Sequence, residues 1–193
     1  GREMKTYFPS WLQQTSILFL WGLVYYLSGL ISLKFDDPNS AIAIVWLPSG
    51  VAVAAFLSAR WRDYPALILI FALASVLLDE AWQNIPLFLT TLGYSLLAMP
   101  ANVLLAWLVH RFSRPNDDLH VILLWICATF VVSVLDALIV GGGYAFFTDQ
   151  PVAKTISNGF VADVTGIFFA TTVVMGFVNK RGSRAALAWS TRI

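Results

Sequence analysis

Two carboxylates stand inside apolar stretches of the chain. Asp136 lies in a run from about Leu119 to Val140, and Asp163 lies in a run from about Ile156 to Val178. An ionised carboxylate at bilayer depth costs about 3 kcal/mol or more, so such residues usually face the interior of a helix bundle or a wet cavity. Carboxylates so placed could carry a proton, bind a cation or an amine, or join two helices by a hydrogen bond. We therefore expect the chemistry of the chain at these two positions.

Two further features could belong to the same site. The tripeptide Pro48-Ser49-Gly50 interrupts an apolar run from about Ala41 to Leu57. Proline removes a backbone donor, which leaves either a plain kink or a broken helix that offers backbone groups to a ligand. Asp79 and Glu80 end the next apolar run. They are either a solvated helix end or the rim of the site.

The elements that must position these residues are apolar segments long enough to cross a membrane. The composition supports this, because 59% of the residues are hydrophobic and 12% are charged, against about 45–50% and about 25% in soluble domains. Backbone exposed to lipid must satisfy its own hydrogen bonds, so continuous apolar runs predict helices. The runs extend approximately from Trp11 to Leu33, Ala41 to Leu57, Tyr64 to Leu78, Ile85 to Val109, Leu119 to Val140 and Ile156 to Val178.

The sequence therefore predicts an all-α integral membrane protein with about six transmembrane helices, the second of them broken at Pro48-Ser49-Gly50. We expect one membrane-embedded domain at 11–178, an N-terminal tail at 1–10 and a basic tail or linker at 179–193. Residues 1–3 precede Met4 and are interpreted as a possible cloning remnant, so no prediction rests on them. Six helices of about 20 residues leave no room for a soluble catalytic domain.

No catalytic or metal-binding constellation is visible in the sequence. The chain lacks a nucleophile elbow, a nucleotide-binding motif and metal-ligand spacing, and it identifies no cofactor. Its basic C-terminal run, which includes Lys180 and Arg181, is too short to indicate nucleic-acid binding. The chain is therefore not expected to be an enzyme. We expect it to contact membrane lipid.

The basic residues predict the orientation of the helices. Ten of the 12 Lys and Arg residues lie on the side that holds both termini and the loops after the second and fourth helices, and only Lys34 and Lys154 lie on the other side. Loops rich in Lys and Arg stay in the cytoplasm. Both termini are therefore predicted to be cytoplasmic, in the inner membrane of a bacterium.

The depths of the polar residues predict a pocket that opens to the external side. Asp136 lies about five residues before the predicted helix end at Gly141, and Asp163 about seven residues after Ile156. At 1.5 Å per residue both carboxylates lie about 8–11 Å below the external surface. Pro48 reaches a similar depth. The predicted pocket is lined by Trp46, Ser49, Asp79, Asp136 and Asp163, and its negative character suits a cation, an amine or a proton-linked response.

A packing interpretation of the same aspartates stays open. Asp163 shares a helical face with Gly159, Gly166 and Ala170, which is a small-residue stripe that lets helices approach closely. Asp163 would then only join two helices. Similarly, Ser133 and Thr129 share a face with Asp136 and could satisfy its carboxyl group locally.

Two blocks of the sequence resemble a bacterial family, the membrane-associated sensor domain of the first type (MASE). The first block is Ile44-Val45-Trp46-Leu47-Pro48-Ser49-Gly50 with the small residues that follow, then Arg60-Trp61 and Tyr64-Pro65-Ala66; the second is Ala162-Asp163-Val164-Thr165-Gly166. The chain departs from the family pattern at Leu47, where a proline is common, and at Thr172. Members often carry about eight helices, two more than predicted here.

The resemblance implies a sensory input domain. Such domains usually precede a cytoplasmic diguanylate cyclase, cyclic di-GMP phosphodiesterase or histidine kinase, so the parent protein is expected to have such an output domain, in cis or as a partner in trans, and to act as a homodimer. Trp46, Pro48, Ser49, Gly50, Asp79, Asp136, Asp163 and Gly166 are the residues expected to bind a small-molecule ligand or carry the signal. The alternative is a transport component that resembles the substrate-capture subunit of a vitamin transporter.

Overall fold

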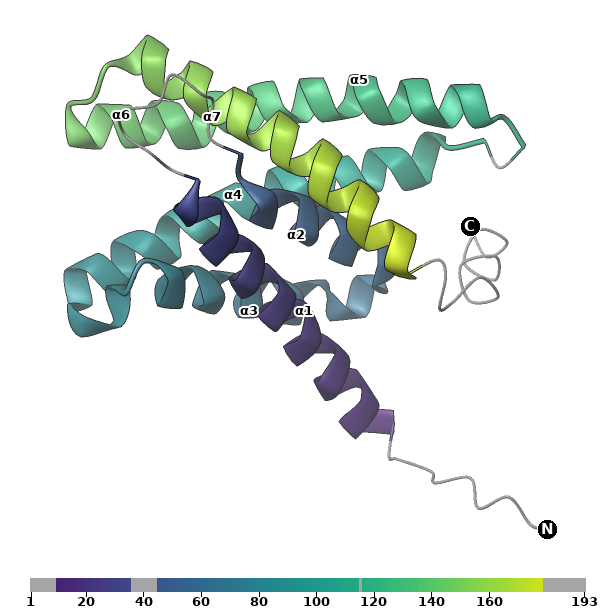
Figure 1. Ribbon diagram of the computed structural model, residues 1–193. Helices are drawn as coiled ribbons and strands as arrows, with labels where there is room; N and C mark the ends of the chain where they lie inside the picture. Colours follow the sequence, from purple (N-terminus) through teal and green to yellow (C-terminus); the bar gives the residue numbers. More distant parts are fainter. Residues whose placement is uncertain (1–9, 36–44, 115, 179–193) are drawn as a thin grey trace.

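The protein is a bundle of α-helices (Figure 1). The computed structural model describes residues 10–35, 45–114 and 116–178. Five helices in these ranges are long and apolar enough to cross a membrane, and a sixth is shorter. The elements are α1 (Ser10–Lys34), α2 (Leu47–Ser58), α3 (Tyr64–Leu78), α4 (Ile85–Phe112), α5 (Asp118–Asp136), α6 (Gly142–Thr148) and α7 (Val152–Gly166). Two π-helical turns, η3 (Ala137–Gly141) and η4 (Ile167–Thr171), follow α5 and α7.

The short helix α2 lies at the centre of the bundle. Every residue from Pro48 to Phe56 is buried, and α2 packs against α1, α3, α4, α7 and η4. Its length of 12 residues corresponds to about 18 Å, which is less than the hydrocarbon thickness. Residues 45 and 46, just before it, are not helical, and within a membrane such backbone is tolerated only where protein covers it. The other helices supply that cover.

The predicted break inside the second helix is wrong. Trp46 is the N-cap residue of α2, and Pro48 occupies the first turn, so the tripeptide begins the helix instead of interrupting it. Proline suits this position because the first amide groups of a helix have no acceptor within the helix. The predicted segment from Ala41 also extends too far, because residues 45 and 46 are not helical; residues 41–44 lie outside the described residues.

The last two membrane helices are longer than predicted. α5, η3 and α6 form one helical span that ends at Thr148, beyond the predicted end at Val140. The glycines at 141–143, which we expected to end the helix, continue it instead, because helical neighbours on both sides outweigh their weak helix propensity. The final span runs from Val152 to Val178, so it begins before the predicted Ile156.

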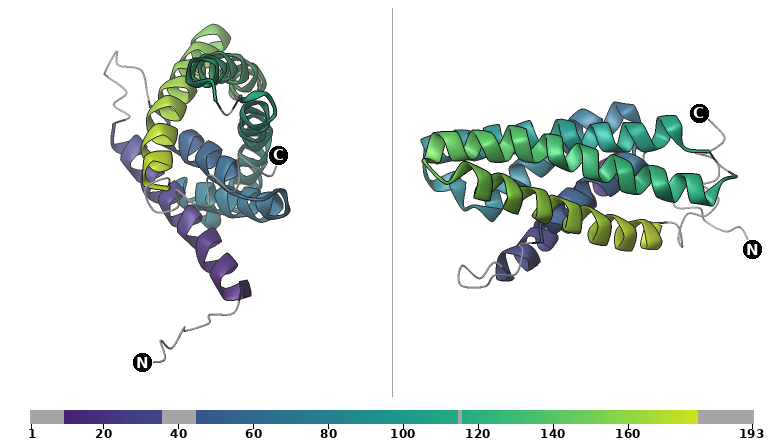
Figure 2. Two further views of the ribbon diagram at one scale, coloured as in Figure 1. Left: turned by 90° about the vertical axis from the view of Figure 1, so that its right-hand side faces the viewer. Right: turned by 90° about the horizontal axis from the view of Figure 1, so that it is seen from above.

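The spans run back and forth between the two ends of the bundle. In Figure 1 the start of α1 and the end of the span that contains α7 lie toward the same end, while the α3–α4 and α6–α7 connections lie toward the other. Figure 2 shows α7 alongside the rod formed by α5 and α6, with α1 crossing the bundle obliquely. Of the predicted tails at 1–10 and 179–193, residues 1–9 and 179–193 lie outside the described residues, and Ser10 is the first residue of α1.

Candidate functional site

The start of α2 is fixed to α7 and α1 by hydrogen bonds. The Trp46 amide donates to the Ala162 carbonyl oxygen at 3.1 Å, and the Ser49 hydroxyl donates to the Asp163 carboxylate at 3.0 Å. From the other side, the Leu47 amide donates to the Ser32 hydroxyl of α1 at 2.9 Å. The Asp163 carboxyl group therefore lies at the N-terminal end of α2, where the helix dipole favours negative charge.

Two glycines let the backbones of α2 and α7 approach each other. A methyl group on Gly166 would overlap the Trp46 carbonyl group, and a methyl group on Gly50 would overlap the Gly166 carbonyl oxygen and the Ala170 side chain. The Gly50 carbonyl also accepts a hydrogen bond from the Thr171 hydroxyl at 2.8 Å. Larger side chains at positions 50 and 166 would separate the two helices. We name this region, residues 46–50 against 162–171, the α2–α7 contact.

Asp136 and Asp163 face each other across the boundary between α5 and α7. Their carboxyl groups lie close enough to interact with each other. Ionised carboxylates only accept hydrogen bonds, so a bond between two of them requires a proton on one. The pair can thus hold a proton, or a cation can bridge it. Each π-helical turn begins shortly after one of these aspartates, and such turns are frequent at functional sites.

The aspartate pair lies deeper than the sequence predicted. Asp136 is 12 residues from the helix end at Thr148 and Asp163 is 11 residues from Val152, so both lie about 17 Å from those ends instead of about 8–11 Å. The expected local hydrogen bonds of Asp136 are also absent. Within the described residues, the Thr129 hydroxyl, the Ser133 hydroxyl and one Asp136 carboxyl oxygen have no hydrogen-bond partner although they are buried.

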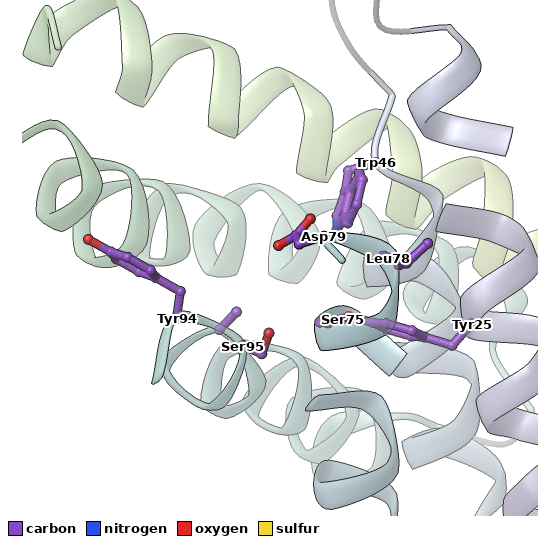
Figure 3. A pocket seen from close by; sticks show the side chains of 8 residues that line it. Tyr25, Trp46, Ser75, Leu78, Asp79, Tyr94 and Ser95 are labelled. Carbon is purple, nitrogen blue, oxygen red and sulfur yellow. The ribbon is translucent and has the colours of Figure 1, made fainter. Parts of the chain in front are cut away.

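A partly open pocket lies between α1, α3, α4 and the residue before α2 (Figure 3). It encloses about 150 Å³ and is lined by Tyr25, Trp46, Ser75, Leu78, Asp79, Tyr94, Ser95 and Ala98. The part of the lining that α3 contributes ends with that helix. Asp79 is the C-cap residue of α3, and Glu80 then turns the chain in a left-handed conformation with φ of 50°. Asn84 caps the start of α4 by accepting from the Leu87 amide.

The Asp79 carboxyl group gives the pocket a negative character. Partial burial raises its pKa above the ordinary value. The side chain nevertheless keeps access to the outside of the protein. The carboxyl groups of Asp79, Asp136 and Asp163 all act electrostatically on the Tyr25 hydroxyl. The pocket and the aspartate pair therefore lie close enough to share one electrostatic field.

The residues predicted for one pocket thus divide into two neighbouring groups. Trp46 and Asp79 line the pocket, whereas Ser49 and the half-buried Asp136 and Asp163 form a polar cluster beside it. Pro48, Gly50 and Gly166 belong to the α2–α7 contact and do not line the pocket.

Sequence reasoning missed the pocket residues on α1 and α4. Tyr25 and Tyr94 are aromatic residues in apolar runs, where they are indistinguishable from lipid-facing or core residues. A polar residue three positions from a tyrosine, or next to one, in a membrane helix was the available signal. Ser28 and Ser95 give that signal near these tyrosines, but only Ser95 lines the pocket.

The whole chain was also compared with models of protein families. The MASE1 family model matches residues 15–190. The chain belongs to the MASE1 family. MASE1 is a membrane sensory domain of bacterial signalling and is not itself catalytic. Comparisons of this MASE1 domain with curated proteins and with solved structures gave no match.

In this MASE1 domain the two sequence blocks that resemble the family form the α2–α7 contact. The first block contributes Trp46, Ser49 and Gly50, and the second contributes Ala162, Asp163 and Gly166. These residues meet through two hydrogen bonds and a close backbone approach. The spacing within each block therefore has a physical reason, since Pro48 starts α2, Ser49 donates to Asp163 and the glycines admit the neighbouring backbone.

Proposed function

We propose that this MASE1 domain senses a small molecule in the pocket of Trp46 and Asp79, and passes the signal through the α2–α7 contact to a cytoplasmic output domain. The output would be a cyclic di-GMP enzyme or a histidine kinase, in the same chain or in a partner, and the domain would act as a homodimer in the bacterial inner membrane. Its family membership favours this role over the transport component.

One observation carries the proposal. Trp46 takes part in both regions, because its side chain lines the pocket while its amide group donates to the Ala162 carbonyl. A ligand that moves the Trp46 ring would therefore strain the contact with α7. A ligand changes the state of a protein only by binding one arrangement better than another, and Trp46 provides a physical means for that difference.

The direction of the signal is supported by the charges at the ends of the helices. Arg60, Arg62, Arg111 and Arg114 lie in or beside the connections after α2 and α4, whereas the pocket lies near the α3–α4 connection at the other end. The positive-inside rule then favours an outward-facing pocket. Beyond η4 the span continues to Val178, toward the end where we expect the output domain.

The test replaces each aspartate of the pair by asparagine in the full-length parent protein. We expect Asp136→Asn and Asp163→Asn to change the output, measured as cyclic di-GMP formed or as histidine phosphorylated, at least several-fold. Asparagine keeps the shape but cannot exchange the proton of the pair. Asp149→Asn is the matched control, since Asp149 is an exposed acid at the end of α6. If the Asp136→Asn and Asp163→Asn proteins both fold and give wild-type output, the proposal is wrong.

A further inference from the structure

We propose that the pocket beside Trp46 binds a small quaternary ammonium compound. This inference rests on the proposed sensory function and names the class of ligand for the same pocket. It is carried by the aromatic lining, by the charge of the lining residues and by their hydrogen bonds.

The lining is rich in aromatic side chains that come from three parts of the chain. Tyr25 belongs to α1, Trp46 stands just before α2, and Tyr94 belongs to α4. Figure 3 shows Trp46 directly beside Asp79, with Tyr94 and Ser95 on one side of the pocket. Tryptophan and tyrosine rings attract cations through their electron-rich faces, and quaternary ammonium groups are commonly recognised in this way.

The charge of the lining selects a cation. Among the described residues that line the pocket, Asp79 is the only charged one. Its carboxyl group makes no hydrogen bond or ion pair with any residue in the ranges that the structure describes. A carboxylate that is partly withdrawn from water gains from an opposite charge within a few ångströms. Anionic ligands would meet this carboxylate, so they are disfavoured.

The aromatic character of the lining favours a quaternary over a primary amine, and part of the hydrogen-bonding capacity of the lining is already used within the protein. The Tyr25 and Ser75 hydroxyl groups pair with each other at 3.2 Å, and Ser75 also donates to the Phe71 carbonyl at 3.0 Å. A primary ammonium group brings three donors that each need an acceptor. A quaternary ammonium group brings none, so it loses little when aromatic rings replace its water.

The volume of the pocket limits the size of the ligand. The pocket encloses about 150 Å³, and an apolar cavity of about that volume can hold benzene. Choline and tetramethylammonium are of comparable size. Choline also carries a hydroxyl group that could reach the open side of the pocket.

The first experiment measures equilibrium binding of choline to the purified chain in lipid nanodiscs. The matched control ligand is 3,3-dimethylbutan-1-ol, which has the shape of choline without its charge. We expect choline to bind at least tenfold more tightly than the neutral compound. Equal affinities, or no binding of choline, would overturn the proposal. This comparison uses the unchanged protein, so it does not depend on the folding of any variant.

The second experiment assigns the binding to the pocket. Asp79→Asn should weaken choline binding at least tenfold, whereas Glu80→Gln should leave it unchanged, because Glu80 is the next residue in the chain but does not line the pocket. Trp46→Leu should weaken binding several-fold, and Trp46→Phe should retain part of it. Equal affinities of Asp79→Asn and the wild type would contradict the assignment.

The outcomes separate this inference from the proposed function. Choline binding requires no output domain, and the aspartate test requires no known ligand. If choline fails to bind while Asp136→Asn and Asp163→Asn alter the output, the ligand class is wrong and the sensory site stands. If choline binds as expected while both aspartate variants keep the wild-type output, the ligand site stands and the signalling proposal fails.

Discussion

The α2–α7 contact and the pocket are neighbours with opposite construction. The contact brings two backbones together, with hydrogen bonds from Trp46 and Ser49 and no space for a methyl group at Gly166. The pocket is formed mainly by side chains from three other helices and leaves about 150 Å³ open. A closely packed interface has few alternative arrangements, whereas an open pocket accepts a guest. In the proposed function, the pocket binds the ligand and the α2–α7 contact transmits the resulting movement of Trp46.

The largest expected effect is that of a methyl group inside the contact. Gly166→Ala should lower the free energy of unfolding by about 2 kcal/mol or more, because the new Cβ overlaps the Trp46 carbonyl group and neither backbone can yield easily. Gly159→Ala on the same helix is the control, since its Cβ meets no atom within 4 Å. Thermal unfolding of both variants in nanodiscs measures the difference. Equal melting temperatures would mean that the contact is looser than described.

A smaller loss of stability is expected when the Asp163 carboxyl group, which accepts the hydrogen bond from Ser49, is removed. Asp163→Ala should destabilise the domain by about 1–3 kcal/mol, because it leaves the buried Ser49 hydroxyl without its partner. Asp136→Ala should cost less, since Asp163 keeps its bond to Ser49. Unfolding of these variants and of Ser49→Ala, alone and combined with Asp163→Ala, completes a double-mutant cycle. Strictly additive losses would argue against the bond.

A substitution in the pocket should affect ligand binding more than stability. Asp79→Asn should change the free energy of unfolding by no more than about 0.5 kcal/mol, because no hydrogen bond or ion pair within the described residues depends on this carboxyl group. The same variant should bind choline at least tenfold more weakly. Unfolding and binding measured on one preparation test both statements. A large loss of stability would place Asp79 among the structural residues.

The smallest expected effect is a shift in the pH dependence of choline binding. Burial raises the pKa of the Asp79 carboxyl group above its ordinary value of 3.8. Protonation removes the charge that attracts the cation, so affinity should fall on acidification and begin to fall at a higher pH than an ordinary aspartate allows. The other titratable groups near this site are the Tyr25 and Tyr94 hydroxyls and, beyond them, Asp136 and Asp163. A titration of Asp79→Asn, which should be flat in that range, identifies the group.

The sequence predicted the helical architecture well because apolar length is a local property. Five of the predicted segments correspond to long membrane helices, and the sixth to the shorter α2. Helix ends were less predictable. The glycines at 141–143 suggested an end that the structure does not have, because packing of this span against α7 supports them in a helix.

The candidate site was predicted in its residues more than in its arrangement. Asp136, Asp163 and Ser49 were expected together and lie together, because polar residues at membrane depth have few alternatives to one another. The division into a pocket and a separate polar cluster could not be predicted, since it depends on where α3 ends relative to α2. Likewise, Pro48 suggested a break, and only the position of Trp46 as N-cap shows that it starts the helix.

The central claim is that the α2–α7 contact transmits the signal. The most direct measurement compares the output of the full-length parent protein carrying Gly166→Ala with that carrying Gly159→Ala, as cyclic di-GMP formed or as histidine phosphorylated. The account predicts that the first variant fixes the output at one level that no longer responds to the signal, while the second responds like the wild type. A folded Gly166→Ala protein with a wild-type response would contradict it.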